Sequence, residues 1–245
     1  MNRLSVVIPA RDESGHLPDT LRELDRTLCE AAIEHEIVVV DDHSTDGSPA
    51  LLRGLTGEVP TLVVVENERP GGYGNAVVTG IETATGDAVA VFMADGSDRP
   101  DDLVRFVRAM EEQNVDCVFG TRFSKGGKVV DYPLPKLLLN RMANNVIRLL
   151  FGIRYDDMTN AFKLYRRHVL DGCRPFLSHH FNLTVELPLK AIIHGYSYVV
   201  VPNTWINRAE GVSKFQIREM GSRYVFIVLY CWLERRLSRG DYVRR

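Results

Sequence analysis

Four clusters of polar side chains stand out because each one directly follows a short apolar run. They are PARDE at residues 9–13, DDHSTDG at 41–47, RPGGYGNA at 69–76 and MADGSD at 93–98. Turn or helix-cap chemistry accounts for any one of them alone. Together they indicate a ligand site, because carboxylates suit ribose hydroxyls, base amino groups and a divalent metal. A glycine-rich turn also lets the backbone approach a phosphate or a base closely.

The apolar runs before these clusters predict strands. Residues 4–8, 36–40, 61–65 and 88–92 are short and rich in β-branched side chains, as is typical of strands buried on both faces of a parallel sheet. Because ligands of such sheets bind beyond the carboxyl ends of the strands, the four clusters are expected at one edge.

Helices are expected between these strands. Leucines recur at positions 17, 21, 24 and 28, with Ser14 as an N-cap and Pro18 in the first turn. Residues 74–84 and 100–113 predict two more helices. Strand–helix alternation predicts an α/β fold in which a mostly parallel, twisted, doubly wound sheet carries helices on both faces.

The second half of the chain has a different pattern. Residues 135–153 predict an apolar helix, and the segment from 132 to 155 holds four basic residues and no acid. A helix at 183–194, a strand at 196–201 and an amphipathic stretch from residue 215 follow. We expect one domain over residues 1–212 and a basic, amphipathic C-terminal extension over residues 213–245.

Composition narrows the class of protein. The 245 residues are 45% apolar and 25% charged with a net charge of −2, which indicates a globular chain and no nucleic-acid partner. The four cysteines have no CxxC spacing, so neither a zinc site nor a disulfide framework is expected, and a reducing cytosol is favoured. No secretory signal is predicted, since residues 4–8 run into charged residues 11–13. The longest uncharged apolar run, 224–233, is half of the ~20 residues that a spanning helix needs.

The motifs taken together resemble a known family. SVVIPARDE at 5–13, VVVDDHSTDGS at 38–48, GGYGNA at 71–76 and ADGSD at 94–98 resemble family-2 glycosyltransferases of the GT-A fold. In the second half, GTRF at 120–123, DMTNAFK at 157–163 and RAEGVSK at 208–214 resemble dolichol-phosphate mannose synthases and related polyprenyl-phosphate sugar transferases.

The resemblance implies a nucleotide-sugar donor site with a metal. Asp95 matches the last carboxylate of the family's DxD motif and would hold Mg²⁺ or Mn²⁺ on the donor diphosphate. Met93 stands where that motif has its first Asp, and Asp98 is a candidate second carboxylate or an acid at the start of a helix. The remaining donor-site residues by resemblance are Pro9, Arg11, Glu13, Asp41, Asp42, Arg69, Gly72 and Ser97.

The resemblance also implies an acceptor side. Arg122 matches an arginine that the synthases use near the phosphates, and it joins Asp95 as the second expected catalytic residue. Lys136 and Asn140 stand where the synthases have arginine and serine, and Lys136 lacks the bidentate phosphate recognition of an arginine. Ser213 and Lys214 suit a loop over phosphate, or a plain surface turn.

The implied reaction is inverting transfer of a hexose from GDP-mannose or a UDP-sugar to a polyprenyl phosphate. A phosphate acceptor has its second pKa near ~6, so it is already charged at pH 7 and needs no general base. A family-2 enzyme acting on a hydroxyl of a glycan or secondary metabolite is the alternative, and it would need a base. Asp156, Asp157 and Glu186 are the candidates, although Glu186 also suits an ion pair at the edge of the core.

Two other classes are weighed against these enzymes. A nucleotide-binding module without catalysis is the second alternative, suggested by Met93. A nicotinamide dehydrogenase is disfavoured, because no G-x-G-x-x-G follows the first strand.

Access to a lipid substrate calls for a membrane surface. Residues 224–233 are uncharged and apolar, and five arginines and two acids, Glu234 and Asp241, follow them. Apolar residues beside cations suit a helix in the headgroup region, so peripheral binding to the cytoplasmic face is expected, helped by a small membrane-spanning partner as in some relatives. Packing of residues 224–233 on the core is the alternative.

Overall fold

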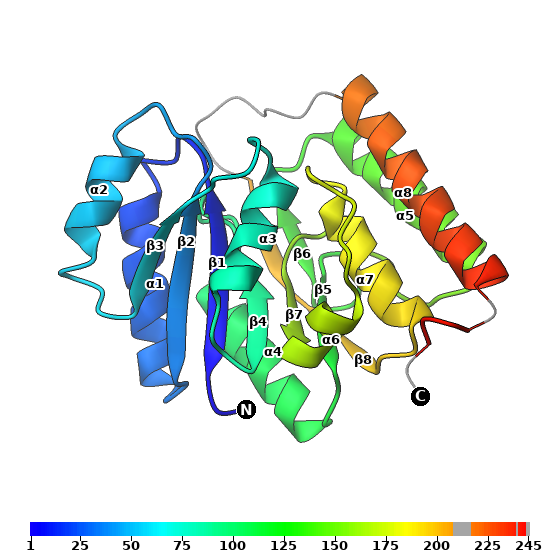
Figure 1. Cartoon of the computed structure of the whole chain (residues 1–245), viewed down its shortest axis with the longest axis horizontal. Coiled ribbons are helices and arrows are strands. Elements are labelled where there is room, and N and C mark those ends of the chain that lie inside the picture. Colours follow the sequence, from blue (N-terminus) through cyan, green and yellow to red (C-terminus); the bar gives the residue numbers. More distant parts are fainter. Residues whose placement is uncertain (208–216, 239, 244–245) are drawn as a thin grey trace.

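The computed structural model describes residues 1–207, 217–238 and 240–243. Its centre is a seven-stranded sheet of order β3-β2-β1-β4-β7-β5-β8 (Figure 1). The pairs β3·β2, β2·β1, β1·β4 and β5·β8 are parallel, whereas β7 is antiparallel to both β4 and β5. The predicted mostly parallel α/β sheet is confirmed.

The first half alternates between strands and helices as the apolar pattern predicts. The elements are β1 (Leu4–Ala10), α1 (Leu17–Glu30), β2 (His35–Asp41), α2 (Ser48–Leu55), β3 (Leu62–Glu66), α3 (Tyr73–Thr83), β4 (Ala88–Val91) and α4 (Pro100–Glu112). The predicted cap at Ser14 is wrong, because α1 begins only at Leu17 after His16, and Ser14 instead donates its backbone N–H to Asp46 Oδ2 at 3.1 Å.

The second half adds elements that the sequence pattern did not predict. Its elements are β5 (Cys117–Thr121), β6 (Lys128–Val130), α5 (Leu134–Phe151), β7 (Lys163–Arg166), α6 (Arg167–Gly172), α7 (Leu183–Ile193), β8 (Tyr198–Pro202), β9 (Thr204–Ile206) and α8 (Ile217–Leu237). Strands β6, β7 and β9 have three or four residues each, too few for a visible period. The short pair β6·β9 forms a second sheet.

Two apolar layers cover the sheet. One core joins β1, β2 and β4 to α1, α2 and α4, and the other joins the opposite faces of the same strands to α3, α5, α7 and α8. Side chains at consecutive strand positions alternate between them, as Val6 and Val7 do. Helices therefore lie on both faces, as predicted (Figure 1).

Helix α8 packs on the body of the protein along one side. Ile227 and Cys231 are fully buried in the second core, and His194 Nε2 of the α7 cap lies 2.5 Å from Glu234 Oε1. The predicted boundary at residues 212/213 lies outside the described residues. Among the helices that the structure describes, none combines the length and the apolar character needed to cross a membrane.

Candidate active site

Asp42, at the carboxyl end of β2, organises the glycine-rich turn. Its Oδ1 accepts a hydrogen bond from Asn67 Nδ2 at 2.7 Å, and its Oδ2 accepts one from the Gly72 N–H at 2.8 Å. Asn67 Oδ1 in turn accepts from the Arg69 N–H at 3.1 Å and from Thr79 Oγ1 at 3.0 Å. Asn67 was not singled out from the sequence, although a polar residue directly after an apolar strand is a usable signal. Asp42 therefore holds the turn in place from the interior.

Asp41, unlike Asp42, has a carboxylate oxygen that is left for a ligand. It is buried at the end of β2, and its Oδ1 has no hydrogen-bond partner within the described chain. A buried carboxylate oxygen without a partner is costly unless a ligand satisfies it. Because Asp41 lies at the strand ends, this oxygen is placed to accept a hydrogen bond from a hydroxyl or an N–H group of a bound nucleoside.

The loop after β1 is joined to the loop after β2. Backbone N–H groups of Asp12 and Glu13 donate to Ser44 Oγ (3.0 Å) and Ser48 Oγ (3.1 Å). Burial alone would raise the pKa of Asp46, but hydrogen bonds from Ser48 and Ser14 hold it well below its ordinary value. The β1·β2 register pairs Ala10 with Asp41, so the predicted donor-site residues Pro9, Arg11 and Glu13 lie at or just beyond the end of β1 that neighbours Asp41.

The glycine turn is packed by the protein itself. A Cβ on Gly72 would lie 2.5 Å from the carbonyl oxygen of His179, and one on Gly74 would lie 2.3 Å from that of Ser178. Tyr73 also stacks on Phe181 with ring centroids 4.1 Å apart. The space that these glycines leave open is thus taken by residues 178–181. Sequence reasoning did not anticipate that segment as part of the site.

Arg11 and Arg69 lie at the outer rim. A Cβ on Gly71 would be 3.3 Å from Arg11 Nη1, so the Arg11 side chain runs along the turn. The exposed Arg69 guanidinium pairs with Glu82 of α3 at 2.7 Å, a pairing that directs it toward α3.

Two carboxylates follow β4. The half-buried Asp95 accepts the Ser97 N–H at 3.1 Å, and the buried Asp98 accepts the Met93 N–H at 3.2 Å. Burial, reinforced by the charge of Asp95, raises the pKa of Asp98 to about 8. Asp98 precedes the N-cap Arg99, and the acids in the first turn of α4 are Asp101 and Asp102.

These groups fit a hard divalent cation. Asp95 and Asp98 are close enough for their charges to repel, and the buried Ser97 Oγ has no partner in the described structure. Such an all-oxygen set is what Mg²⁺ and Mn²⁺ prefer, and Mg²⁺ needs only one or two protein carboxylates besides phosphate oxygens. The residues present therefore fit the metal that the family resemblance implies at Asp95.

Arg122, at the end of β5, is fixed by Asp157. Asp157 accepts hydrogen bonds from Arg122 N (2.9 Å), Nε (2.8 Å) and Nη2 (2.6 Å). The exposed fraction of Arg122 is 7%, and Asp157 is fully buried. Burial alone would lower the pKa of Arg122, but the Asp157 charge raises it above its ordinary value, so the guanidinium stays charged.

The predicted acceptor residues on α5 gather around this pair. Asn140 Nδ2 donates to Thr159 Oγ1 at 2.8 Å, and Arg122 Nη2 lies 3.4 Å from the same hydroxyl. Lys136 Nζ lies 5.7 Å from the centre of the Tyr132 ring, and the Arg122 guanidinium lies 6.0 Å from it. The charge of Arg122 also acts on Asp98, which connects the acceptor and metal sides. The other two predicted acceptor residues, Ser213 and Lys214, lie outside the described residues.

Each candidate base is already engaged by a neighbour. Asp157 binds Arg122, as above, and Asp156 Oδ1 accepts from Thr121 Oγ1 at 2.7 Å. Glu186 is fully buried, lies 2.9 Å from Lys190 Nζ, and accepts the N–H groups of Leu177 and Ser178. The alternative interpretation of Glu186 as an ion pair is confirmed.

A buried lysine underlies the acceptor side and was missed from the sequence as a functional residue. Lys163 Nζ donates to the carbonyls of Met158 (3.0 Å) and Thr184 (3.1 Å) and to that of Asn160. Burial lowers its pKa to about 7. Lys163 ties the segment that carries Asp157 to helix α7.

Comparisons with known proteins show the family of this chain. Residues 5–173 match the family described as glycosyl transferase family 2. A polyprenol monophosphomannose synthase of Mycolicibacterium smegmatis is 33% identical over 237 residues, covering 90% of this chain and 88% of that protein. A dolichol-phosphate mannosyltransferase of Pyrococcus furiosus is 31% identical over 219 residues, covering 87% of this chain and 59% of that protein.

Solved structures show the same fold. Glucosyl-3-phosphoglycerate synthase from Mycobacterium tuberculosis superposes with a TM-score of 0.72 at 18% identity, covering 96% of this chain and 78% of that one. At this identity the likeness shows the fold alone.

Proposed function

This chain belongs to glycosyl transferase family 2 and is a glycosyltransferase of the GT-A fold, and from that premise we propose that it moves a hexose from a nucleotide-diphosphate sugar to a polyprenyl phosphate. The proposed donor is GDP-mannose or a UDP-sugar. The relatives named above are a polyprenol monophosphomannose synthase and a dolichol-phosphate mannosyltransferase, which supports this class of acceptor.

One observation carries the choice of acceptor. All three carboxylates considered as a general base, Asp156, Asp157 and Glu186, already accept hydrogen bonds from other groups of the chain. A hydroxyl nucleophile needs a base to take its proton, whereas a phosphate monoester is largely ionised at pH 7. The geometry therefore favours a phosphate over the hydroxyl of a glycan or secondary metabolite.

The donor side would bind the nucleotide along the strand ends. Asp41 Oδ1 would accept a hydroxyl or N–H of the nucleoside, while Asp42 holds the glycine turn beside it. Asp95 and Asp98 would hold Mg²⁺ or Mn²⁺, which supplies positive charge to the leaving diphosphate. The Mycobacterium tuberculosis synthase, which has the same fold, was solved in complex with Mn²⁺ and uridine diphosphate, which supports a divalent metal and a nucleoside diphosphate as ligands.

The acceptor side would hold the attacking phosphate. Arg122, kept charged by Asp157, and Lys136 would bind its oxygens, with Asn140 as a neutral donor. A phosphate oxygen forms the new bond to the anomeric carbon as the bond to the nucleotide diphosphate breaks. The leaving group departs with the electron pair, so a single in-line displacement inverts the anomeric centre. Rate enhancement then comes from alignment and charge stabilisation.

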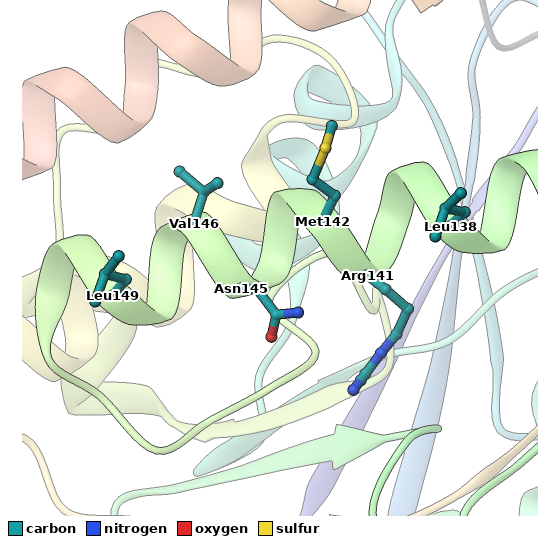
Figure 2. Close-up of a pocket in the computed structure, with 6 residues that line it drawn as sticks. All are labelled: Leu138, Arg141, Met142, Asn145, Val146 and Leu149. Carbon is teal, nitrogen blue, oxygen red and sulfur yellow. The ribbon is translucent and has the colours of Figure 1, made fainter.

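The lipid tail would lie along α5 and α8. The exposed face of α5 presents Leu138 (73% exposed), Met142, Val146 and Leu149 (87% exposed), and these residues line an open hollow with Arg141 and Asn145 (Figure 2). Helix α8 runs close to α5 and exposes Val225, Phe226, Leu229 and Leu233 (Figure 1).

Both helices also carry basic residues. They are Lys136, Arg141 and Arg148 on α5 and Arg235 and Arg236 on α8. Apolar residues among cations suit the headgroup region of an anionic leaflet. We therefore propose peripheral binding at the cytoplasmic face of a membrane, assisted by a small membrane-spanning partner.

Turnover of labelled nucleotide sugars tests the reaction. Each donor is incubated with polyprenyl phosphate, with the matching polyprenol, or with no acceptor, in the presence of Mg²⁺. The proposal expects transfer only to the phosphate. Equal transfer to polyprenol or to a soluble glycan would make the hydroxyl-acceptor enzyme correct, and binding of a donor without turnover would make the chain a nucleotide-binding module.

Sedimentation with anionic liposomes tests the membrane surface. Wild type should pellet at low salt, and replacing the exposed Leu138 and Leu149 by Glu should leave the protein in the supernatant. Arg53→Glu, at an exposed position of α2 in the other helical layer, changes the net charge by the same two units and serves as a control. Equal pelleting of all three proteins would contradict the assignment of α5 to the membrane.

A further inference from the structure

Three residues that can bind metal gather at the edge of the sheet opposite the active site. Asp25 and Cys29 lie one turn apart on α1, and His35 begins β2. Because His35 pairs with Leu4 at the start of β1, this cluster lies at the amino ends of the strands. The donor-site carboxylates Asp42 and Asp95 follow the other ends.

His35 is held in one orientation. Its side chain is buried, and Nδ1 lies 2.8 Å from the carbonyl oxygen of Ile33, which can only accept. Nδ1 therefore carries the hydrogen, and the Nε2 of a neutral ring presents a lone pair. That nitrogen faces Asp25 Oδ1 at 3.1 Å. The lone pair of Nε2 and the Asp25 carboxylate oxygen are both acceptors, so their close approach requires a bound cation between them or a second proton on the ring.

The third donor completes a mixed N, O and S set. The exposed Cys29 thiol shares the helix face of Asp25, and the three ligand atoms all lie within 4.8 Å of one another. Tetrahedral zinc bonds of about 2.0–2.3 Å place neighbouring ligand atoms about 3.3–3.6 Å apart. The observed separations therefore need only a small movement of the Cys29 side chain.

The surroundings also suit a cation. Thr61 Oγ1 donates to Asp25 Oδ1, and the Ile33 carbonyl fixes His35, as partners of ligands commonly do in metal sites.

We propose that Asp25, Cys29 and His35 bind one Zn²⁺, with water as the fourth ligand. The ion would join the last turns of α1 to the start of β2 across the short connection at residues 31–34. Spacing of the cysteines could not indicate such a site, because it uses a single thiolate together with donors from two elements. The site is independent of the proposed transfer reaction.

Metal titration of the full chain tests the proposal. Excess Mg²⁺ is kept present to occupy the oxygen site at Asp95, and Zn²⁺ is titrated against a chromophoric chelator. Wild type should bind one Zn²⁺, and Co²⁺ in its place should give a thiolate-to-metal charge-transfer band in the near ultraviolet. Zn²⁺ should also raise the Tm, because it binds only the folded chain.

Variants distinguish this site from adventitious binding. Cys29→Ala, at an exposed position, should abolish the charge-transfer band, and both Cys29→Ala and Asp25→Asn should weaken Zn²⁺ binding at least 10-fold. Glu23→Gln on the same helix should change neither. Wild type without the band, or variants with unchanged affinity, would overturn the proposal.

Discussion

Removing Asp157 should show how much of the site depends on one buried ion pair. In Asp157→Leu, the Arg122 guanidinium loses two hydrogen bonds of 2.6 and 2.8 Å, and the Arg122 backbone N–H loses one of 2.9 Å. The guanidinium keeps its charge on a residue that is 7% exposed. Leaving one member of a buried pair uncompensated costs about 3–5 kcal/mol. A chain of this size loses about 2–4 °C of Tm per kcal/mol, so the Tm should fall by about 6–20 °C.

The second half of the experiment removes both charges. Replacing a buried pair by apolar groups of similar volume is often neutral or stabilising, so Arg122→Met combined with Asp157→Leu should melt near wild type. The double-mutant cycle should therefore show a coupling of about 3 kcal/mol or more in the free energy of unfolding. Transfer to polyprenyl phosphate should stay lost in the double variant, since the cation is gone.

Urea unfolding and turnover are measured on the same four proteins. Stability restored without activity separates the structural role of the pair from the role of Arg122 at the acceptor. If the single losses in stability simply add, the pair is not coupled as its geometry requires. If donor affinity by calorimetry falls as much as acceptor use, Arg122 belongs to the donor side.

Four further outcomes are expected. Asp95→Ala, or removal of divalent metal with EDTA, should abolish transfer while circular dichroism stays unchanged, and full activity in both cases would contradict the metal role. Met93→Asp should keep or raise the rate, whereas a clean loss would show that Met93 packs against the donor. Lys136→Ala should reduce kcat/KM for polyprenyl phosphate about 30-fold, the equivalent of about 2 kcal/mol, with unchanged donor affinity by calorimetry. Burial alone would raise the pKa of Glu36, but hydrogen bonds from Ser5 and Thr85 lower this pKa below its ordinary value of 4.5. The ionised Glu36 therefore stabilises the folded state above pH 4.5, and this stabilisation is lost as the pH falls through the folded-state pKa. Glu36→Gln should therefore lower the free energy of unfolding at pH 7 by about 1–3 kcal/mol and flatten its decline in acid, and parallel pH curves would refute this.

The sequence predicted the helices and strands whose apolar residues recur at a regular spacing. Apolar strands and leucine spacing indicated the first four strands and most helices, because burial of one face leaves a repeating pattern. Strand β7 left no such pattern, since its four residues start with the buried Lys163 and end with Arg166. Its antiparallel direction follows from pairing partners far away along the chain.

The location of the candidate site could be predicted from the sequence, but the contacts between its residues could not. Strand-end clusters indicated the edge at which ligands bind, and the family resemblance indicated Asp95 and Arg122. The pairing of Arg122 with Asp157 and the filling of the glycine turn by residues 178–181 depend on distant segments meeting in space. Spacing along the chain does not encode such contacts.

The position of β7 has a consequence for local opening. Flanked by β4 and β5 in the middle of the sheet, this strand should have amides among the slowest to exchange with deuterium. The segment that carries Asp157 leads directly into it and is tied there by Lys163. The loops beside Asp42 follow β2 and β3, toward the sheet's margin, and the loop after β2 is joined to the loop after β1 partly by exposed hydrogen bonds. On gentle warming, the nucleotide end of the pocket should therefore fray first, while the phosphate end keeps its native shape until the whole molecule unfolds.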